Sequence, residues 1–336
     1  MPAALHEHAV TVVDAAHAAP VTTRCPLCGS GGARPLFAVD GCPWRVVSCP
    51  GCALARLDPP PSEDELAPFY PDAYYGDPGQ KFHPFIERLV RFVSARHVRF
   101  LSRKVPAGGR VLDVGCGRGV LLSALADRGF EVHGVERSAA AASGADPRAR
   151  IRIAPDLAAA AYPAGGFDAI FVWHVLEHLC EPVRAVDEMR RILRPGGRLV
   201  VAVPNFSSLQ ARWAGPAWFH LDLPRHVFQF PMPALRRLLD QAGFVRESEH
   251  HFSLRQNPFG WIQSSLNRRS DLPRNGLYTL LHRRSRGEPP AFDAATRRRL
   301  VVAGLLRAPA AIALTFVEAA LRSGGTVHVV ARKPAA

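Results

Sequence analysis

The amino-acid sequence predicts an α/β fold of the doubly wound type, preceded by a small cysteine-rich unit. Residues 110–138 contain an apolar strand, a glycine-rich turn, a helix with leucines at helical spacing and a second apolar strand. Strands and helices continue to alternate up to residue 205, and a last strand follows at residues 326–333. Two C-x-x-C pairs lie ahead of this whole region.

Apolar runs between glycine and proline breakers indicate the individual elements. The fourth strand is a continuous apolar run, which is typical of the middle of a parallel sheet. The strands are expected at residues 111–114, 132–135, 151–153, 169–173, 198–203, 245–252 and 326–333, and amphipathic helices at residues 84–104, 182–193 and 233–242.

The composition is that of an ordinary globular protein with a basic balance. Of 336 residues, 48% are hydrophobic and 21% are charged, and 42 Lys and Arg against 29 Asp and Glu give a net charge of +13. Such a charge raises the question of nucleic acid or an anionic membrane, although the excess of Arg over Lys indicates a compositional bias. Residues 1–22 lack the features of a signal peptide, so we expect a flexible leader and a cytoplasmic protein with reduced thiols.

The glycine turn is suited to close contact with a nucleoside ligand. Its glycines are spaced G-x-G-x-G, and Val120 stands where the dinucleotide fingerprint requires a third glycine. Asp113 precedes the turn and suits a cationic ligand better than a pyrophosphate, while Glu136 ends the second strand, where a carboxylate can accept both ribose hydroxyls. S-adenosylmethionine has a ribose, a sulfonium and an α-amino group. A nicotinamide cofactor, or a turn without ligand, is the alternative.

Three segments resemble the class I methyltransferases. Residues 113–119, D-V-G-C-G-R-G, resemble the first motif of that superfamily, and residues 167–179 and 192–203 resemble the fourth and fifth motifs. The resemblance implies a Rossmann-like sheet of seven mostly parallel strands, with the last strand antiparallel and the methyltransferase domain in residues 106–255 and 323–336. It also implies a set of residues around S-adenosylmethionine: Asp113, Gly115, Cys116, Gly117, Gly119, Glu136, Asp156, Trp173 and His174.

His174 and His178 are spaced i, i+4, which would place two metal ligands on one face of a helix. The resemblance of this segment to the fourth motif favours a position beside the cofactor or a helix cap instead.

Four cysteines in residues 23–57 predict a structural zinc ribbon. Each C-x-x-C pair brings two thiolates together, and four thiolates complete a closed tetrahedral shell. A redox-active pair is the competing interpretation. Cys42 is left over, and the expected zinc ligands are Cys25, Cys28, Cys49 and Cys52.

The segment at residues 213–231 is dense in aromatic and titratable residues and follows the fifth strand. With the four-cysteine head, the chain is similar to the subgroup that includes deoxysugar C-methyltransferases, whose corresponding segment carries an acid–histidine pair. His226 matches that histidine and is the candidate general base, with His220 and Asp222 as further candidates. Arg225 stands where the acid would be, and it would suit an anionic acceptor. In the alternative interpretation the histidines only cap or fill the loop.

The remaining segments bear on partners. Residues 63–105 are expected to form a linker and lid helices, and residues 256–322 a basic and apolar helical insertion. This insertion either packs as a helical cap or lies on an anionic bilayer. We therefore expect a methyltransferase acting on a small or lipid-linked acceptor. A nucleic-acid methyltransferase and a non-catalytic, partner-binding scaffold are the alternatives, and the oligomeric state stays open.

Overall fold

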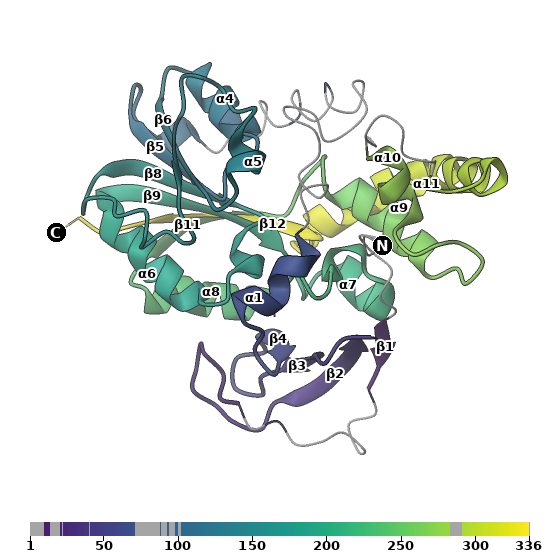
Figure 1. Ribbon diagram of the computed structural model, residues 1–336. Coiled ribbons are helices and arrows are strands. Elements are labelled where there is room, and N and C mark those ends of the chain that lie inside the picture. The colour runs from purple at the N-terminus through teal and green to yellow at the C-terminus, as the bar shows by residue number, and fades with distance from the viewer. Residues whose placement is uncertain are drawn as a thin grey trace.

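The computed structural model describes residues 10–13, 21, 23–39, 41–70, 88, 93, 98, 99, 102–282 and 291–335. A seven-stranded sheet with strand order β11-β12-β9-β8-β5-β6-β7 forms its centre (Figure 1). Strands β7, β6, β5, β8 and β9 run parallel, and β12 is antiparallel to both of its neighbours. The strands are β5 (Arg110–Val114), β6 (Glu131–Glu136), β7 (Arg150–Ile153), β8 (Phe167–Trp173), β9 (Leu193–Pro204), β11 (Val245–His250) and β12 (Thr326–Arg332). The predicted doubly wound fold is confirmed.

Helices cover both faces of this sheet because its central strands are apolar on both sides. Along β8, Ile170 and Val172 belong to one buried cluster, and Ala169 and Phe171 belong to another. Helices α6 and α8 pack on the first face, and α4 packs on the second. The helices around the sheet are α4 (Val120–Ala126), α5 (Ala139–Ala142), α6 (Pro182–Ile192), α7 (Leu209–Ala214) and α8 (Met232–Gln241), with short 3-10 turns at Ser102–Lys104, Leu176–His178, Gly215–Ala217 and Phe219–Leu221.

A second, smaller sheet of five strands lies below the first in Figure 1. It consists of β1 (Val10–Val12), β2 (Arg34–Val39), β3 (Arg45–Ser48), β4 (Ala55–Asp58) and β10 (Phe228–Gln229), in that order and all antiparallel. The chain then continues through α1 (Glu63–Leu66) and the 3-10 turn Ala67–Phe69. Strand β10 comes from the distant segment 213–231, so the cysteine-rich unit and the main domain share one sheet.

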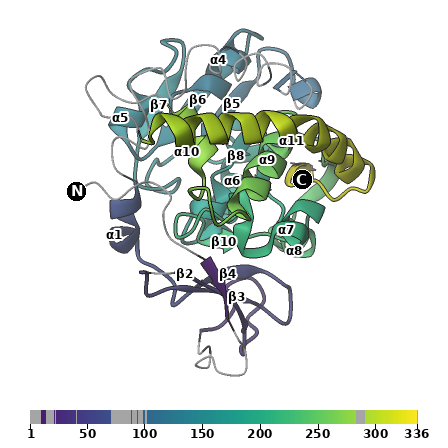
Figure 2. The same cartoon turned by 90° about the vertical axis from the view of Figure 1, so that its right-hand side faces the viewer.

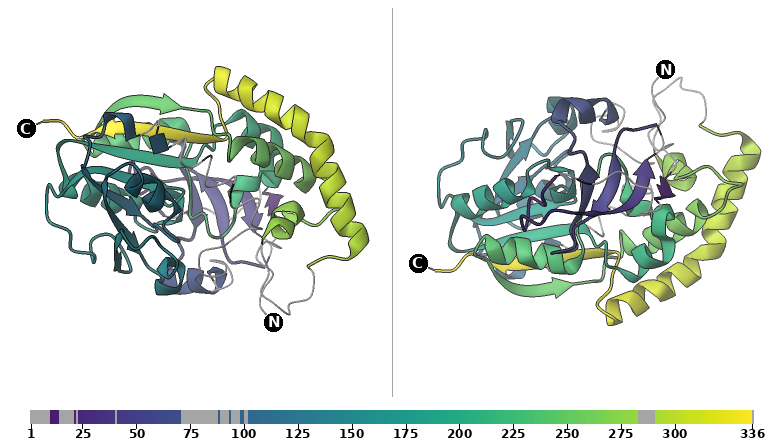
Figure 3. Two further views of the ribbon diagram at one scale, coloured as in Figure 1. Left: turned by 90° about the horizontal axis from the view of Figure 1, so that it is seen from above. Right: turned by 90° about the horizontal axis from the view of Figure 1, so that it is seen from below.

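In the described parts of the stretch between β11 and β12, three helices form a separate layer. They are α9 (Asn257–Asn267), α10 (Gly276–Leu281) and α11 (Ala294–Ala320). Helix α11 packs on α9 and α10 through residues such as Leu300, and the indole N–H of Trp261 donates to a carboxylate oxygen of Glu318 at 3.0 Å. Figure 2 shows α11 running across the face of the molecule that is turned to the viewer, and Figure 3 shows the same helix along the right-hand edge in both views. By length and composition alone, α11 is apolar enough to cross a membrane.

The N-terminal third of the chain contains a strand where a flexible leader was expected. Val10–Val12 lies in the expected flexible leader, yet it forms β1 and pairs with β2, because its alternating apolar residues extend the edge of the small sheet. This part of the expectation was wrong. The helix expected at residues 84–104 falls largely outside the described residues.

Candidate functional site

A cavity of about 740 Å³ lies at the carboxyl ends of the parallel strands. Ligands of doubly wound sheets bind at this edge, where loops leave the strands in opposite directions. The wall includes Gly115 and Gly117 of the glycine turn, Glu136 at the end of β6, and Asp156 after β7. Apolar side chains, among them Leu157, complete this part of the wall. The volume falls in the range of small-molecule and cofactor sites.

The glycine turn keeps its shape through the carboxylate of Glu136. One carboxylate oxygen accepts the backbone N–H of Gly117 at 2.9 Å, and the other accepts those of Arg137 and Ser138 at 2.8 and 3.1 Å. Gly117 has a φ of 48°, and a Cβ added there would meet no atom of the described residues within 4 Å. The backbone of the turn is therefore accessible to a ligand from the cavity side. This is the arrangement expected for close contact with a nucleoside.

Four of the expected cofactor residues lie behind this wall. Asp113 is buried, and the pKa of its carboxyl is raised well above the usual range. Burial is the larger cause, and the negative charge of Glu136 is the smaller one. Cys116 packs against Gly134, where an added Cβ would come within 2.7 Å of its sulfur. Gly119 is the N-cap residue of α4. The ring centroid of Trp173 lies 4.9 Å from that of His328. These four residues lie behind the part of the wall formed by Gly115, Gly117 and Glu136, which we call the cofactor cradle.

The other end of the cavity is lined by histidines that follow β8. His174 and His178 both lie on the wall, next to Arg255 and Tyr70. His174 has a φ of 54°, and its Nδ1 lies 3.2 Å from a carboxylate oxygen of Glu177. The pKa of His174 is lowered to about 3, mainly by burial and to a smaller extent by the positive charge of Arg255. Its ring is therefore neutral near pH 7. The two histidines do not share a helix, since Leu176–His178 is a 3-10 turn.

Glu177, His178 and His226 form a compact group, which we call the histidine–glutamate cluster. One ligand atom from each lies within 4.8 Å of the others, and the rings of His178 and His226 meet edge to face at 4.5 Å. Nδ1 of His226 lies 2.8 Å from the carbonyl of His220, and Nδ1 of His178 lies 3.1 Å from the carbonyl of Arg225 and 2.9 Å from the hydroxyl of Tyr70. Tyr70 thus connects the chain after the small sheet to this cluster.

The remaining candidates from the 213–231 segment are His220 and Asp222. His220 is buried, its ring stacks on that of His174 at 6.3 Å, and burial lowers its pKa to about 3. Asp222 accepts two N–H bonds from Arg225, including one from Nε at 3.1 Å. The charge of Arg225 is therefore neutralised inside the protein. The expectation that Arg225 meets an anionic acceptor loses its basis, because this guanidinium is buried against Asp222.

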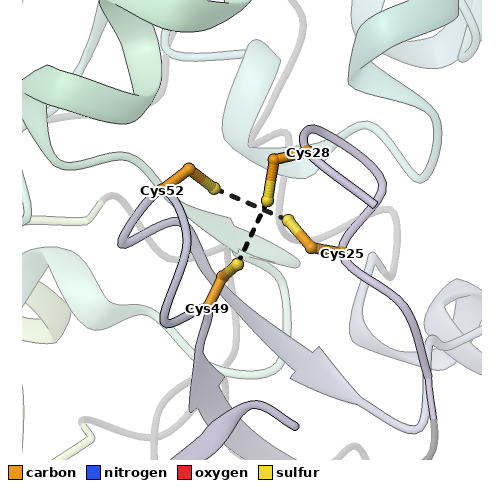
Figure 4. A group of neighbouring side chains, drawn as sticks. All are labelled: Cys25, Cys28, Cys49 and Cys52. Carbon is orange, nitrogen blue, oxygen red and sulfur yellow. Dashed lines mark hydrogen bonds between the residues drawn. The ribbon is translucent and has the colours of Figure 1, made fainter. Parts of the chain in front are cut away.

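The four cysteines of the small sheet converge on one point (Figure 4). The sulfurs of Cys25 and Cys52 are 3.6 Å apart, those of Cys28 and Cys49 are 3.3 Å apart, and all four lie within 4.8 Å of one another. Zinc–sulfur bonds of about 2.3 Å in a tetrahedron require sulfur–sulfur distances of about 3.8 Å. None of the seven cysteines, all of which lie in the described residues, forms a disulfide.

Comparisons with known proteins agree with this geometry. A family model described as a methyltransferase domain matches residues 85–249. The ubiquinone biosynthesis O-methyltransferase of Thiobacillus denitrificans is 32% identical over 211 residues, which are 58% of this chain and 87% of that relative. This chain belongs to the class I S-adenosylmethionine-dependent methyltransferase family.

Two further relatives are also ubiquinone biosynthesis O-methyltransferases. The Psychrobacter arcticus protein is 36% identical over 48% of this chain and 70% of its own length. The Xylella fastidiosa protein is 40% identical, but the match spans only 32% of this chain and 46% of that relative. A solved methyltransferase from Archaeoglobus fulgidus has a TM-score of 0.45 and 15% identity, covering 73% of this chain and 94% of its own.

The cradle of this methyltransferase fits S-adenosylmethionine. Gly117 leaves room for the ligand, and Glu136 stands on the wall at the end of β6, where ribose hydroxyls are bound in doubly wound folds. Gly115, Asp156 and His174 also lie on the wall. Sequence reasoning placed Tyr70 in the expected linker and lid segment, residues 63–105, and did not single out Arg255. A single Arg carries no motif, so only the tertiary fold reveals that both residues lie on the cavity wall.

Substituting Gly117 tests the cradle. We expect Gly117→Leu to abolish measurable binding of S-adenosylhomocysteine in calorimetry, because the new side chain projects into the cavity. Gly129→Leu is a matched control, since Gly129 also has a positive φ (80°) and open space around an added Cβ, but lies outside the cavity wall. Both variants should lose about 1 kcal/mol of stability from backbone strain. Equal cofactor affinity in the two variants would contradict this assignment.

Proposed function

We propose that this chain transfers a methyl group from S-adenosylmethionine to a hydroxyl group of a small molecule. The observation that carries the proposal is that one cavity of the described structure runs from the glycine turn to His174 and His178. The relatives are ubiquinone biosynthesis O-methyltransferases, and this supports an oxygen acceptor on a small molecule rather than nucleic acid or the sugar carbon of the deoxysugar subgroup. Their O-methyltransferase names also favour an enzyme over a scaffold.

The two ends of the cavity have different roles in this proposal. S-adenosylmethionine, when bound, supplies a methyl carbon that the acceptor oxygen attacks while the carbon–sulfur bond breaks and sulfur keeps the electron pair. The residues of the chain align the acceptor, exclude water and help remove the hydroxyl proton. His178 lies on the wall and His226 lies directly behind it, so the expected base His226 acts as a member of the histidine–glutamate cluster. His220 and Asp222 position it, through a carbonyl and a nearby carboxylate.

Removing the His226 ring tests this role. His226→Ala should lower methyl transfer to a panel of hydroxyl acceptors by about 100-fold or more, while S-adenosylhomocysteine binds with wild-type affinity. His250→Ala, on β11 and away from the cavity wall, is the control and should transfer methyl groups normally. Near wild-type turnover of His226→Ala would show that His226 takes no part in the reaction.

We propose further that Cys25, Cys28, Cys49 and Cys52 bind a structural zinc ion. The support is the convergence of the four thiols, which is the donor set of closed zinc sites. Such an ion stabilises the small sheet, in which β4 pairs with β10 only two residues after His226. Zinc then acts on catalysis indirectly, by keeping the segment that carries His226 in place.

A cysteine pair tests the zinc site. Cys25→Ser should lose stoichiometric zinc, lower the melting temperature by roughly 5 °C or more and reduce turnover, but keep cofactor affinity. Cys42→Ser is the matched control and should retain one zinc, since Cys42 is not among the four converging thiols. Full zinc content in Cys25→Ser would exclude the proposed ligand set.

We also propose that the chain is cytoplasmic and contacts anionic membranes through the outer face of α11. Leu305, Leu306 and Phe316 on this face are 68%, 75% and 59% exposed. The first turns of the same helix carry exposed Arg297 and Arg298, which complement anionic lipid headgroups. The opposite face packs on α9 and α10, so the helix lies on the surface of the domain. A lipid-linked acceptor would be within reach of an enzyme held there.

Vesicle sedimentation tests the contact. Wild-type protein should sediment with vesicles containing phosphatidylglycerol, and the double variant Leu305→Glu and Phe316→Glu should bind about tenfold less. Val245→Glu is the control, because Val245 is 47% exposed but lies on β11. Equal binding by the double variant, or no binding by the wild type, would contradict the membrane proposal.

A further inference from the structure

The histidine–glutamate cluster has a second property that the proposed reaction does not by itself require. Its three side chains come from two separate segments, the turn after β8 and the loop before β10, yet their ligand atoms lie within 4.8 Å of one another. Glu177 is 1% exposed and His226 is 6% exposed, so two of the three groups are almost completely removed from water. A carboxylate and two imidazoles gathered in this way are the donor set of many catalytic metal sites.

The hydrogen bonds of the two imidazoles fix which nitrogen can bind an ion. A backbone carbonyl only accepts hydrogen bonds, so Nδ1 of His226 donates to the carbonyl of His220 at 2.8 Å. Nδ1 of His178 lies 3.1 Å from the carbonyl of Arg225 and 2.9 Å from the hydroxyl oxygen of Tyr70. The Tyr70 hydroxyl donates its proton to the same carbonyl at 3.3 Å, so Nδ1 of His178 is assigned as a donor to both oxygens. In both neutral rings Nε2 then keeps its lone pair. Metal-binding histidines have this arrangement, with the second nitrogen donating to a carbonyl or carboxylate.

The carboxylate of Glu177 supplies an independent sign of a missing partner. One of its oxygens, Oε1, lies 3.2 Å from Nδ1 of His174, whereas the other, Oε2, is buried and has no hydrogen-bond partner among the described residues. Leaving a buried polar atom without a partner costs about 1–3 kcal/mol, and more when the group is charged. A cation bound to Oε2 of Glu177 would remove this cost.

We propose that Glu177, His178 and His226 bind one divalent metal ion at the acceptor end of the cavity. The cluster is separate from the four cysteines, whose thiolates favour zinc in a closed shell. Three protein ligands leave coordination positions open, and His178 places the ion next to the cavity wall. The inference rests on the proposed function, because the hydroxyl acceptor of that function is the ligand that the ion would bind.

The ion would refine the role of the two histidines. A divalent cation that bound a hydroxyl oxygen would lower the pKa of that hydroxyl, so the acceptor O–H bond would break more easily, and the proton would pass to a water molecule held at one of the ion's open coordination positions. The oxygen electron pair then forms the new O–C bond. With the ion bound, the Nε2 lone pairs of His178 and His226 hold the ion, and this role replaces that of proton acceptor proposed above for His226.

Titration with Mn²⁺, followed by the electron paramagnetic resonance of the free ion, tests the inference on zinc-replete protein. We expect the wild type to bind one Mn²⁺ per chain. Glu177→Gln, which keeps the side-chain shape, and His226→Gln should each weaken binding by about tenfold or more. His250→Ala is the control and should bind Mn²⁺ as the wild type does. Absence of Mn²⁺ binding by the wild type, or unchanged affinity in Glu177→Gln, would overturn the inference.

Calorimetry with S-adenosylhomocysteine on the same samples separates the two possible failures. If the wild type and both variants bind S-adenosylhomocysteine but the wild type binds no Mn²⁺, the metal inference is wrong while the proposed methyltransferase activity stands. If the wild type binds neither, the proposed function fails as well. Retained cofactor binding in Glu177→Gln also shows that a loss of Mn²⁺ binding does not come from unfolding.

Discussion

The pairing of β4 with β10 holds the acceptor side of this molecule together. Phe228 and Gln229 pair with Arg56 and Ala55, and the N–H of Leu57 donates to the carbonyl of Val227 at 2.9 Å. On its other side the same segment is bonded to the end of β9, where the N–H of Phe206 donates to the carbonyl of Phe230 at 3.0 Å. The chain just after His226 is thereby fixed between the two sheets.

This constraint divides the site into a local half and a non-local half. The cofactor cradle is built almost entirely from one continuous stretch, since Glu136 bonds to Gly117 across a single strand–helix–strand unit. The acceptor half depends on contacts between distant segments: Tyr70 reaches His178, and His226 reaches its position through β10. Damage to the small sheet should therefore affect turnover before it affects cofactor binding.

The same division explains what the sequence could reveal. The glycine turn, Glu136 and the order of the strands were predictable because they depend on local periodicity and a motif with fixed spacing. The convergence of the four cysteines was predictable from their paired spacing. The neutralisation of Arg225 by Asp222 and the meeting of Glu177 with His226 were not predictable, because they require the path of the 213–231 segment between two sheets. Neither β1 nor β10 was expected, since strands of three and two residues leave little periodicity to detect.

The most direct test of the account is a calorimetric titration of zinc-replete wild-type protein with S-adenosylhomocysteine. The account predicts one binding site per chain with a micromolar dissociation constant, because the cavity at the glycine turn is shaped for this nucleoside. A folded protein that shows no binding heat at any temperature, and no binding of the labelled compound in equilibrium dialysis, would contradict it.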